Sequence, residues 1–286
     1  MPNRVDVSTV HYCHRAAAAR VQAPRASSSG LFYRLNAAIA ARLSRAAERW
    51  CYRPSRTRVL CAVSDGVAAE LRLHFPGAAA SVRTVPNGVD ASTFRPDPPA
   101  RARLRAQLGL GDADRLALFV GGDWERKGLR HAVDALAHAP GWHLAVAGAG
   151  DRSGPSTRAH NAGTSERLHF LGAVREMPPV YAAADSFVFP TAYEAFPLVA
   201  LEAAASGLPI IATRVNGVEQ LVEDGANGWF VGRDGREIGR RLRELAADDT
   251  LARKMAAEAR AAAAGFSWQA MTHGYLDVYA QVSSGA

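Results

Sequence analysis

The 286-residue sequence is poor in cysteine and contains no long apolar run. Its three cysteines, Cys13, Cys51 and Cys61, are odd in number and lie in the first third of the chain, which excludes a disulfide framework and favours a reducing compartment. No stretch approaches the roughly 18 apolar residues of a membrane-spanning helix, and the start of the sequence lacks the apolar block of a signal peptide. We therefore predict a cytoplasmic protein.

Acidic residues are scarce at the start of the chain. Residues 1–60 contain 11 arginines but only Asp6 and Glu48, a balance of +9, whereas residues 61–286 carry −2. Because this arginine-rich part matches no nucleic-acid-binding pattern, we do not expect nucleic acid as a partner. A basic helical segment at 31–58 leaves two interpretations open: contact with anionic lipid at the inner membrane face, or a solvated arginine face.

Short apolar runs alternate with helical stretches from about residue 115 onward. The runs suit strands buried on both faces of a parallel sheet, and the alternation predicts repeated βαβ units. The expected strands are 115–122, 142–150, 167–174, 186–192 and 208–215, and the expected helices are 129–139, 177–185 and 198–207. We expect a polar loop at 151–166 and a helical tail at 235–282, broken near Gly265.

The first 90 residues repeat this pattern with fewer strands. We expect strands at 5–12, 56–64 and 81–86, and helices at 31–52 and 65–75. The turn at Asn87 and Gly88 precedes a stretch rich in Pro, Arg and Asp, which we interpret as a domain boundary. Three strands are few for an independent α/β sheet.

Two glutamates bracket a predicted helix start in the segment 188–217. Glu194 lies in the loop after a strand, Pro197 suits a first helical position, and Glu202 falls in the second turn. The free N–H groups of a helix start favour phosphate, while carboxylates accept hydrogen bonds from hydroxyl groups. The pattern therefore fits a ligand with hydroxyls on either side of a phosphate, such as a nucleotide sugar. A loop carboxylate and a solvated helical glutamate are the alternative.

A second candidate loop, at 119–129, also follows a predicted strand and opens a helix. Gly121, Gly122 and Gly128 permit close backbone approach, and Lys127 is placed to reach an anion. The loop lacks the Walker A pattern. The alternative is a solvated lysine at a helix start.

Other motifs fail or are ambiguous. The segment 148–154 has Ser153 where a dinucleotide fingerprint needs its third glycine, and no G-x-S-x-G is present. His11, Cys13 and His14 lack metal-ligand spacing on what we expect to be an extended segment, so we predict no metal site. For His11 a buried, hydrogen-bonded histidine remains an alternative to a functional one.

The sequence resembles the GT-B glycosyltransferases, specifically the large retaining family with an E-x7-E signature. The signature is EAFPLVALE, from Glu194 to Glu202. Further matches in the same order are VPNGVDASTFRP at 85–96, KGL at 127–129, HFLGAV at 169–174, VNGVEQLVEDGANGWFV at 215–231 and FSWQAMTHGYLDVY at 266–279.

The resemblance implies a role for individual residues of this sequence. Glu194 would contact the transferred sugar and Glu202 the nucleotide ribose, Lys127 would neutralise the departing diphosphate, and His11 would lie near the transferred sugar. The implied donor site comprises Gly121, Gly122, Arg126, Lys127, Val174, Arg175, Glu194, Ala195, Phe196, Pro197, Leu198 and Glu202. Backbone near Val174 and Arg175 would face the base. The family needs no metal or other cofactor, because protein cations take the place of Mg²⁺.

The sequence departs from the family at one position. Members often read V-G-R where this chain has Val120, Gly121 and Gly122, so the usual second cation is missing. We expect Arg126 to substitute for it. The G-x-D-x-x-R-K-G form resembles a sub-group that builds lipopolysaccharide cores.

These observations predict an α/β protein of GT-B architecture with two Rossmann-like halves, the N-terminal one incomplete. The expected parts are an acceptor-side domain at 1–88, a nucleotide-sugar domain at 89–264 and a terminal helix at 265–286 that packs on the first domain. The expected partners are a nucleotide sugar and a glycan or lipid-linked acceptor. The expected function is transfer of a sugar from a nucleotide-diphosphate sugar to an acceptor hydroxyl with retention of configuration. The rival functions are a nucleotide-sugar-binding module without catalysis and a nucleotide-sugar epimerase.

Overall fold

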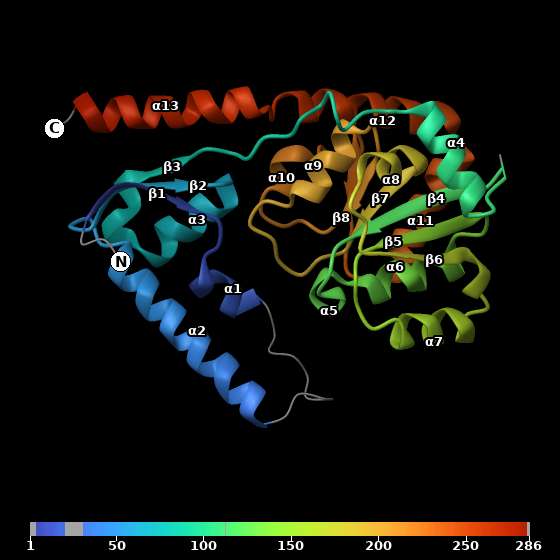
Figure 1. Ribbon diagram of the computed structural model, residues 1–286, viewed down its shortest axis with the longest axis horizontal. Coiled ribbons are helices and arrows are strands. Elements are labelled where there is room, and N and C mark those ends of the chain that lie inside the picture. Colours follow the sequence, from blue (N-terminus) through green and yellow to red (C-terminus); the bar gives the residue numbers. More distant parts are fainter. Residues whose placement is uncertain (1–3, 21–30, 112, 285–286) are drawn as a thin grey trace. The chain divides into compact units, whose positions relative to one another are not determined.

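The computed structural model describes residues 4–20, 31–111 and 113–284. By its internal contacts the chain divides into two compact units, residues 88–268 and residues 1–87 together with 269–286. Each unit has its own parallel sheet (Figure 1). The predicted domain ranges also include residues 1–3, 21–30, 112 and 285–286, which lie outside the described residues.

The first unit is a three-stranded parallel sheet covered by helices. Its strands are β1 (Val5–Val10), β2 (Thr57–Ala62) and β3 (Val82–Thr84), in the order β1-β2-β3. The helices are α1 (His14–Arg20), α2 (Leu31–Cys51), α3 (Asp65–His74), the 3₁₀ helix η1 (Pro76–Ser81) and α13 (Trp268–Ser284). Helix α13 belongs here because Val278 packs on Cys61 and Val85.

The second unit is a six-stranded parallel sheet with doubly wound topology. Its strands are β4 (Arg115–Val120), β5 (Trp142–Ala147), β6 (Leu168–Gly172), β7 (Ser186–Phe189), β8 (Ile210–Ala212) and β9 (Gly228–Phe230). Their order is β6-β5-β4-β7-β8-β9. Numbered from the first strand of this unit, that order is 3-2-1-4-5-6, the Rossmann arrangement. The predicted parallel α/β fold is confirmed.

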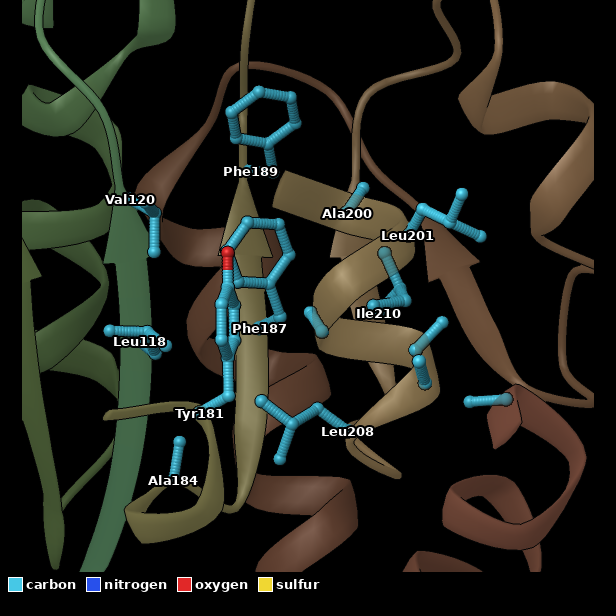
Figure 2. Close-up of a cluster of buried hydrophobic side chains, with 14 of the residues drawn as sticks. Leu118, Val120, Tyr181, Ala184, Phe187, Phe189, Ala200, Leu201, Leu208 and Ile210 are labelled. Atoms are coloured by element: carbon cyan, nitrogen blue, oxygen red, sulfur yellow. The ribbon is translucent and has the colours of Figure 1, made fainter. Parts of the chain in front are cut away.

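Hydrophobic residues fill both faces of this sheet. Along β7, Phe187 and Phe189 join one core cluster while Val188 joins the other, as the alternation of side chains in a strand requires (Figure 2). The covering helices are α4 (Pro98–Gln107), α5 (Trp124–Lys127), α6 (Leu129–Ala135), η2 (Leu136–His138), α7 (Ser153–Asn161), η3 (Ser165–Arg167), α8 (Pro178–Ala183), α9 (Leu198–Ala205), α10 (Val218–Leu221), α11 (Gly235–Ala247) and α12 (Asp249–Ala264). None of the helices in the described ranges is long and apolar enough to cross a membrane.

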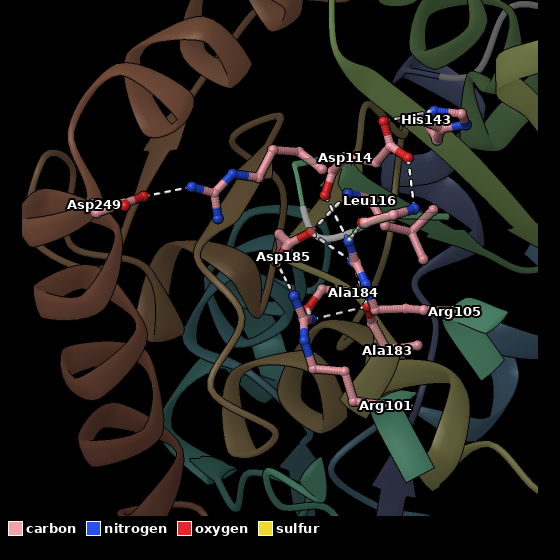
Figure 3. A network of polar contacts seen from close by, with 11 residues as sticks. Arg101, Arg105, Asp114, Leu116, His143, Ala183, Ala184, Asp185 and Asp249 are labelled. Atoms are coloured by element: carbon pink, nitrogen blue, oxygen red, sulfur yellow. Dashed lines mark hydrogen bonds and ion pairs between the residues drawn. The ribbon is translucent and has the colours of Figure 1, made fainter. Parts of the chain in front are cut away.

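A polar network fastens α4 to the sheet (Figure 3). The Asp185 carboxylate accepts hydrogen bonds from Arg101 Nη2 at 2.6 Å, Arg105 Nη1 at 3.1 Å and the Leu116 amide at 2.7 Å. Arg101 also donates to the carbonyls of Ala183 and Ala184 at the end of α8. One carboxylate therefore joins α4, α8 and the start of β4.

The structure corrects four local predictions. The segment expected to be a loop at 151–166 contains α7. The segment 215–231, which by its resemblance to the family corresponds to a loop, contains α10 and the short strand β9. Pro197 precedes the first residue of α9 and does not occupy its first turn. His14 begins α1, so the segment 11–14 is not extended throughout.

A histidine pair in the second unit predicts a pH-dependent stability. His143 Nδ1 and His169 Nε2 lie 2.9 Å apart on adjacent strands. Burial lowers the pKa of both imidazoles; Arg167 and Arg105 act in the same direction on His143, and Asp114 opposes them. Because the folded pKa values lie below the unfolded value of about 6.5, the unfolded chain binds more protons in acid. The free energy of unfolding should therefore fall as pH decreases below about 6.5.

Denaturant titrations between pH 5 and 8 measure the slope of the free energy of unfolding against pH. His131, whose pKa burial and nearby arginines lower to about 4, contributes in the same direction and is kept in every variant. Replacing both His143 and His169 by Asn should flatten the slope below pH 6.5. An unchanged slope in that variant would contradict the prediction.

Candidate functional site

The two predicted functional loops follow neighbouring strands. Residues 121–127 follow β4, and residues 190–197 follow β7, which lies beside β4 in the sheet. Backbone pairing between β4 and β7 ends at Leu118 and Phe187, two residues before the end of each strand. The topology reverses at this point, and the carboxyl edge of a doubly wound sheet binds ligands at such a reversal.

Glu194 is held by three side chains through one of its oxygens. Its Oε1 accepts hydrogen bonds from Arg126 Nη1 and Thr191 Oγ1, each at 3.0 Å, and lies 3.7 Å from Lys127 Nζ. The Glu194 side chain is 14% exposed. The carboxylate therefore lies between two cations, with its orientation fixed from both loops.

Asp123 orients the Arg126 side chain. Asp123 precedes α5 and has a left-handed backbone, φ 47°, the one positive φ of a non-glycine residue in the described part of the chain. Its Oδ2 accepts a hydrogen bond from Arg126 Nε at 2.8 Å, while Arg126 Nη1 also donates to the Tyr193 carbonyl at 2.7 Å. This geometry directs the guanidinium from the β4 loop to the β7 loop.

Lys127 depends on the absence of a side chain at Gly121. A Cβ at Gly121, φ 131°, would lie 2.7 Å from Lys127 Cδ and 2.9 Å from Nζ, so the lysine passes directly over this glycine. Lys127 Nζ also lies 4.9 Å from the centre of the Phe189 ring. Burial lowers the pKa of Lys127, and the Glu194 carboxylate opposes that shift.

Helix α9 begins directly after the loop that contains Glu194. No side chain caps it, and its first turn contains no acidic residue. Gly217 allows the loop to come close, because a Cβ there would lie 2.8 Å from Phe196 Cα. The first amides of α9 are therefore left without a side-chain acceptor, as in an anion-binding helix start.

Glu202 lies in the second turn of α9 and is fixed by a residue that the sequence did not indicate. Its Oε2 accepts a hydrogen bond from Tyr181 Oη at 2.7 Å. Burial raises the pKa of Glu202, and this hydrogen bond partly offsets the shift. Tyr181 and Thr191 were missed in the sequence, where nothing distinguishes them from other polar residues of helices and loops. Asp123 belongs to the G-x-D-x-x-R-K-G form, but no role was assigned to it.

Comparison with known proteins agrees with this geometry. Residues 114–248 match the family model of the "Glycosyl transferases group 1". D-inositol 3-phosphate glycosyltransferase of Xylanimonas cellulosilytica is 38% identical over 215 residues, 71% of this chain and 52% of the relative.

Residues 114–248 therefore form a domain of the group 1 glycosyl transferase family. The chain spans about half the length of the curated relatives it matches.

Solved structures show the fold of this chain. WaaG, a glycosyltransferase involved in lipopolysaccharide biosynthesis, superposes with a TM-score of 0.76 at 24% identity, covering 93% of this chain and 74% of that one. HepE of Anabaena, crystallised with UDP and glucose, gives 0.75 at 23% identity, covering 84% of this chain and 66% of that one. These likenesses establish the Rossmann-like GT-B fold that we predicted.

The remaining predicted site residues lie in several places. Gly122 follows Gly121, Ala195 follows Glu194, and Val174 and Arg175 follow the carboxyl end of β6, the strand beyond β5. Leu198, the first residue of α9, is 40% exposed. Their roles stay predictions.

The histidines of the first unit are not arranged for metal binding. His11 is exposed directly after β1, which excludes the alternative of a buried histidine. Cys13 is fully buried, and burial raises its pKa to about 11, unfavourable for a thiolate ligand. Within the described ranges, no three residues among His, Cys, Asp and Glu are grouped so that they could hold a metal ion.

Proposed function

We propose that this chain transfers a sugar from a nucleotide-diphosphate sugar to an acceptor hydroxyl, with retention of configuration. One observation carries the proposal: Glu194 and Glu202 flank the uncapped start of α9, and Lys127 and Arg126 converge on Glu194. Carboxylates for hydroxyls and cations for phosphate are the groups that such a donor requires. HepE, which has the same fold, was crystallised with UDP-glucose.

In the proposed reaction the bond between the sugar and the diphosphate breaks first. Lys127, Arg126 and the amides at the start of α9 stabilise the negative charge on the departing diphosphate, so that no metal ion is required. The acceptor hydroxyl attacks the same face of the sugar and gives its proton to the departing diphosphate, while Glu194 holds the sugar hydroxyls. No residue in this site is assigned as a nucleophile, and we propose no covalent intermediate.

Titration calorimetry with UDP- and GDP-sugars, combined with a hydrolysis and transfer assay, tests the proposal. We expect binding together with slow hydrolysis, and faster turnover with an acceptor from a panel of D-inositol 3-phosphate, glycans and lipid-linked sugars. Binding without any turnover would favour the non-catalytic binding module. A new nucleotide sugar formed without an acceptor would favour the epimerase.

We also propose that α2 contacts anionic lipid at the inner face of the membrane. Ile39, Leu43 and Trp50 are 45%, 64% and 47% exposed, and their spacing places them on one face of the helix. Arginines lie beside this stripe: Arg56 and Arg53 stack on Trp50, with the Arg56 guanidinium 3.6 Å from the ring centre. Exposed apolar side chains flanked by arginines suit an interfacial helix better than a solvated one.

Sedimentation with vesicles tests this contact. Replacing Ile39 and Leu43 by Ser should weaken binding to phosphatidylserine-containing vesicles at least tenfold, about 1.4 kcal/mol, because two apolar side chains no longer enter the bilayer. Leu276→Ser is the control, since Leu276 of α13 is 56% exposed in the same unit. Equal binding to phosphatidylcholine vesicles, or no effect of the double substitution, would contradict the lipid contact.

A further inference from the structure

The contact between Tyr181 and Glu202 joins two different helices. Tyr181 comes from α8 and Glu202 from α9, and Tyr181 Oη donates to Glu202 Oε2 at 2.7 Å. A hydrogen bond to a carboxylate is stronger and more directional than one between neutral groups. The phenol therefore fixes the position of one carboxylate oxygen.

Tyr181 is itself held rigidly. Its side chain is fully buried, with ring centres of Phe94 and Phe187 at 5.7 Å and 6.3 Å. Figure 2 shows its ring beside Phe187, with the hydroxyl at the end directed towards Phe189, the last residue of β7. A buried ring packed on two others has one available orientation, so the hydroxyl is a fixed donor rather than one of several rotamers.

The second oxygen of Glu202 remains available. Glu202 makes one side-chain hydrogen bond within the described residues, through Oε2. The buried polar side-chain atoms that lack a partner in the described part of the chain belong to Glu48, Trp142, Ser206 and Arg241. Because Glu202 Oε1 is not among them, it reaches the surface. One oxygen is held by the protein and the other faces outward.

We propose that Tyr181 is a positioning residue: its buried hydroxyl holds Glu202 Oε2 and so presents Oε1 to the ribose hydroxyls of the donor nucleotide. This inference rests on the proposed function, in which Glu202 binds the ribose. A carboxylate that is already oriented loses little conformational freedom when a diol binds, so more of the hydrogen-bond energy appears as affinity. Tyr181 thereby contributes to ribose recognition without touching the ligand.

The same hydroxyl also favours the ionised form of Glu202. Burial raises the pKa of Glu202, and among the described residues Tyr181 is the ionisable group that acts on it, lowering the pKa through the hydrogen bond. Without the phenolic hydroxyl the pKa of Glu202 rises further. The protonated carboxyl is a weaker acceptor, so nucleotide affinity falls at low pH. This fall, the acid limb of the pH profile, moves to higher pH when the hydroxyl is removed.

The experiment compares nucleotide binding by four full-length proteins: wild type, Tyr181→Phe, Glu202→Gln and Tyr275→Phe. Calorimetry gives Kd for UDP or GDP, whichever binds more tightly, and for its 2′,3′-dideoxy analogue. We expect Tyr181→Phe to reduce the ribose preference, the ratio of the two Kd values, about tenfold, as for one hydrogen bond to a charged group. Its acid limb should move to higher pH. Tyr275→Phe is the control, because it removes a phenol that hydrogen-bonds Thr9 in the other unit.

Two failures are distinguishable. If Glu202→Gln lowers the ribose preference and Tyr181→Phe leaves both the preference and the acid limb unchanged, the Tyr181 inference is wrong while the proposed function stands. If Glu202→Gln keeps the wild-type preference, the ribose role of Glu202 is wrong and the inference falls with it.

A second measurement avoids any loss of folding in Tyr181→Phe. Protein containing 3-fluorotyrosine keeps the ring and the hydroxyl but has a more acidic phenol, a stronger donor to Glu202. The acid limb should then move to lower pH, the opposite direction. An acid limb that does not move overturns the inference.

Discussion

Replacing Lys127 by alanine is expected to lower kcat/KM at least a hundredfold, about 2.7 kcal/mol of transition-state stabilisation. The Lys127 side chain is 14% exposed, and its Nζ lies 3.7 Å from Glu194 Oε1. Its charge therefore acts in a partly desolvated site. Unit charges about 4 Å apart interact by about 4 kcal/mol at an effective dielectric constant of 20. The loss is smaller than this value because Arg126 remains.

The matched control is Lys254→Ala. Lys254 is the other lysine of the chain and lies exposed on α12. Its replacement should leave kcat/KM unchanged, whereas Lys127→Met should behave like Lys127→Ala, since it keeps most of the length of the side chain and loses the charge. Steady-state kinetics with the donor found by calorimetry make the comparison. Near wild-type turnover in Lys127→Ala would remove Lys127 from the proposed mechanism.

Replacing Asp185 by alanine is expected to lower the free energy of unfolding of the second unit by about 3–5 kcal/mol. The Asp185 side chain is 13% exposed and that of Arg105 10% exposed, so the substitution leaves a nearly buried guanidinium without its counter-charge (Figure 3). The amide of Leu116 also loses its acceptor. Removing one partner of a buried ion pair lowers the stability far more than the intact pair contributes to it, because the remaining charge is buried without compensation.

Asp134→Ala provides the matched contrast. Asp134 pairs with Arg158 at 3.0 Å, but these side chains are 36% and 46% exposed, and exposed pairs contribute only about 0–1 kcal/mol. Urea unfolding followed by tryptophan fluorescence measures the two variants. Similar losses for both would show that the network in Figure 3 does not hold α4 to the sheet.

Much of the fold was predictable because its signals are local. Continuous apolar runs predicted the strands β4, β5, β6, β7 and β8, and the 3.6-residue pattern predicted most helices. The failures have local causes too. Helix α7 contains Gly154, Pro155 and mostly polar residues with one buried side chain, Ala159, so its sequence is typical of a loop. Strand β9 has only three residues and begins with Gly228.

Gly228 explains why β9 was not predicted from the sequence. A Cβ at Gly228 would lie 2.2 Å from the Ile210 carbonyl oxygen, so close pairing with β8 requires glycine there. Glycine in a strand normally weakens the prediction of a strand. Pairing with β8 decides the conformation of β9, and the sequence does not indicate that these two strands are neighbours.

By itself, the sequence determined the apolar runs, the glutamates eight residues apart and the lysine after a glycine loop, because each is a pattern between residues close in the chain. Tertiary structure decided which side chains meet. Arg126 reaches Glu194 because the order 3-2-1-4-5-6 places β4 beside β7. Tyr181 meets Glu202, 21 residues further along, because α8 and α9 lie on the same face of β7. Such contacts depend on strand order and helix packing, which periodicity along a single chain does not encode.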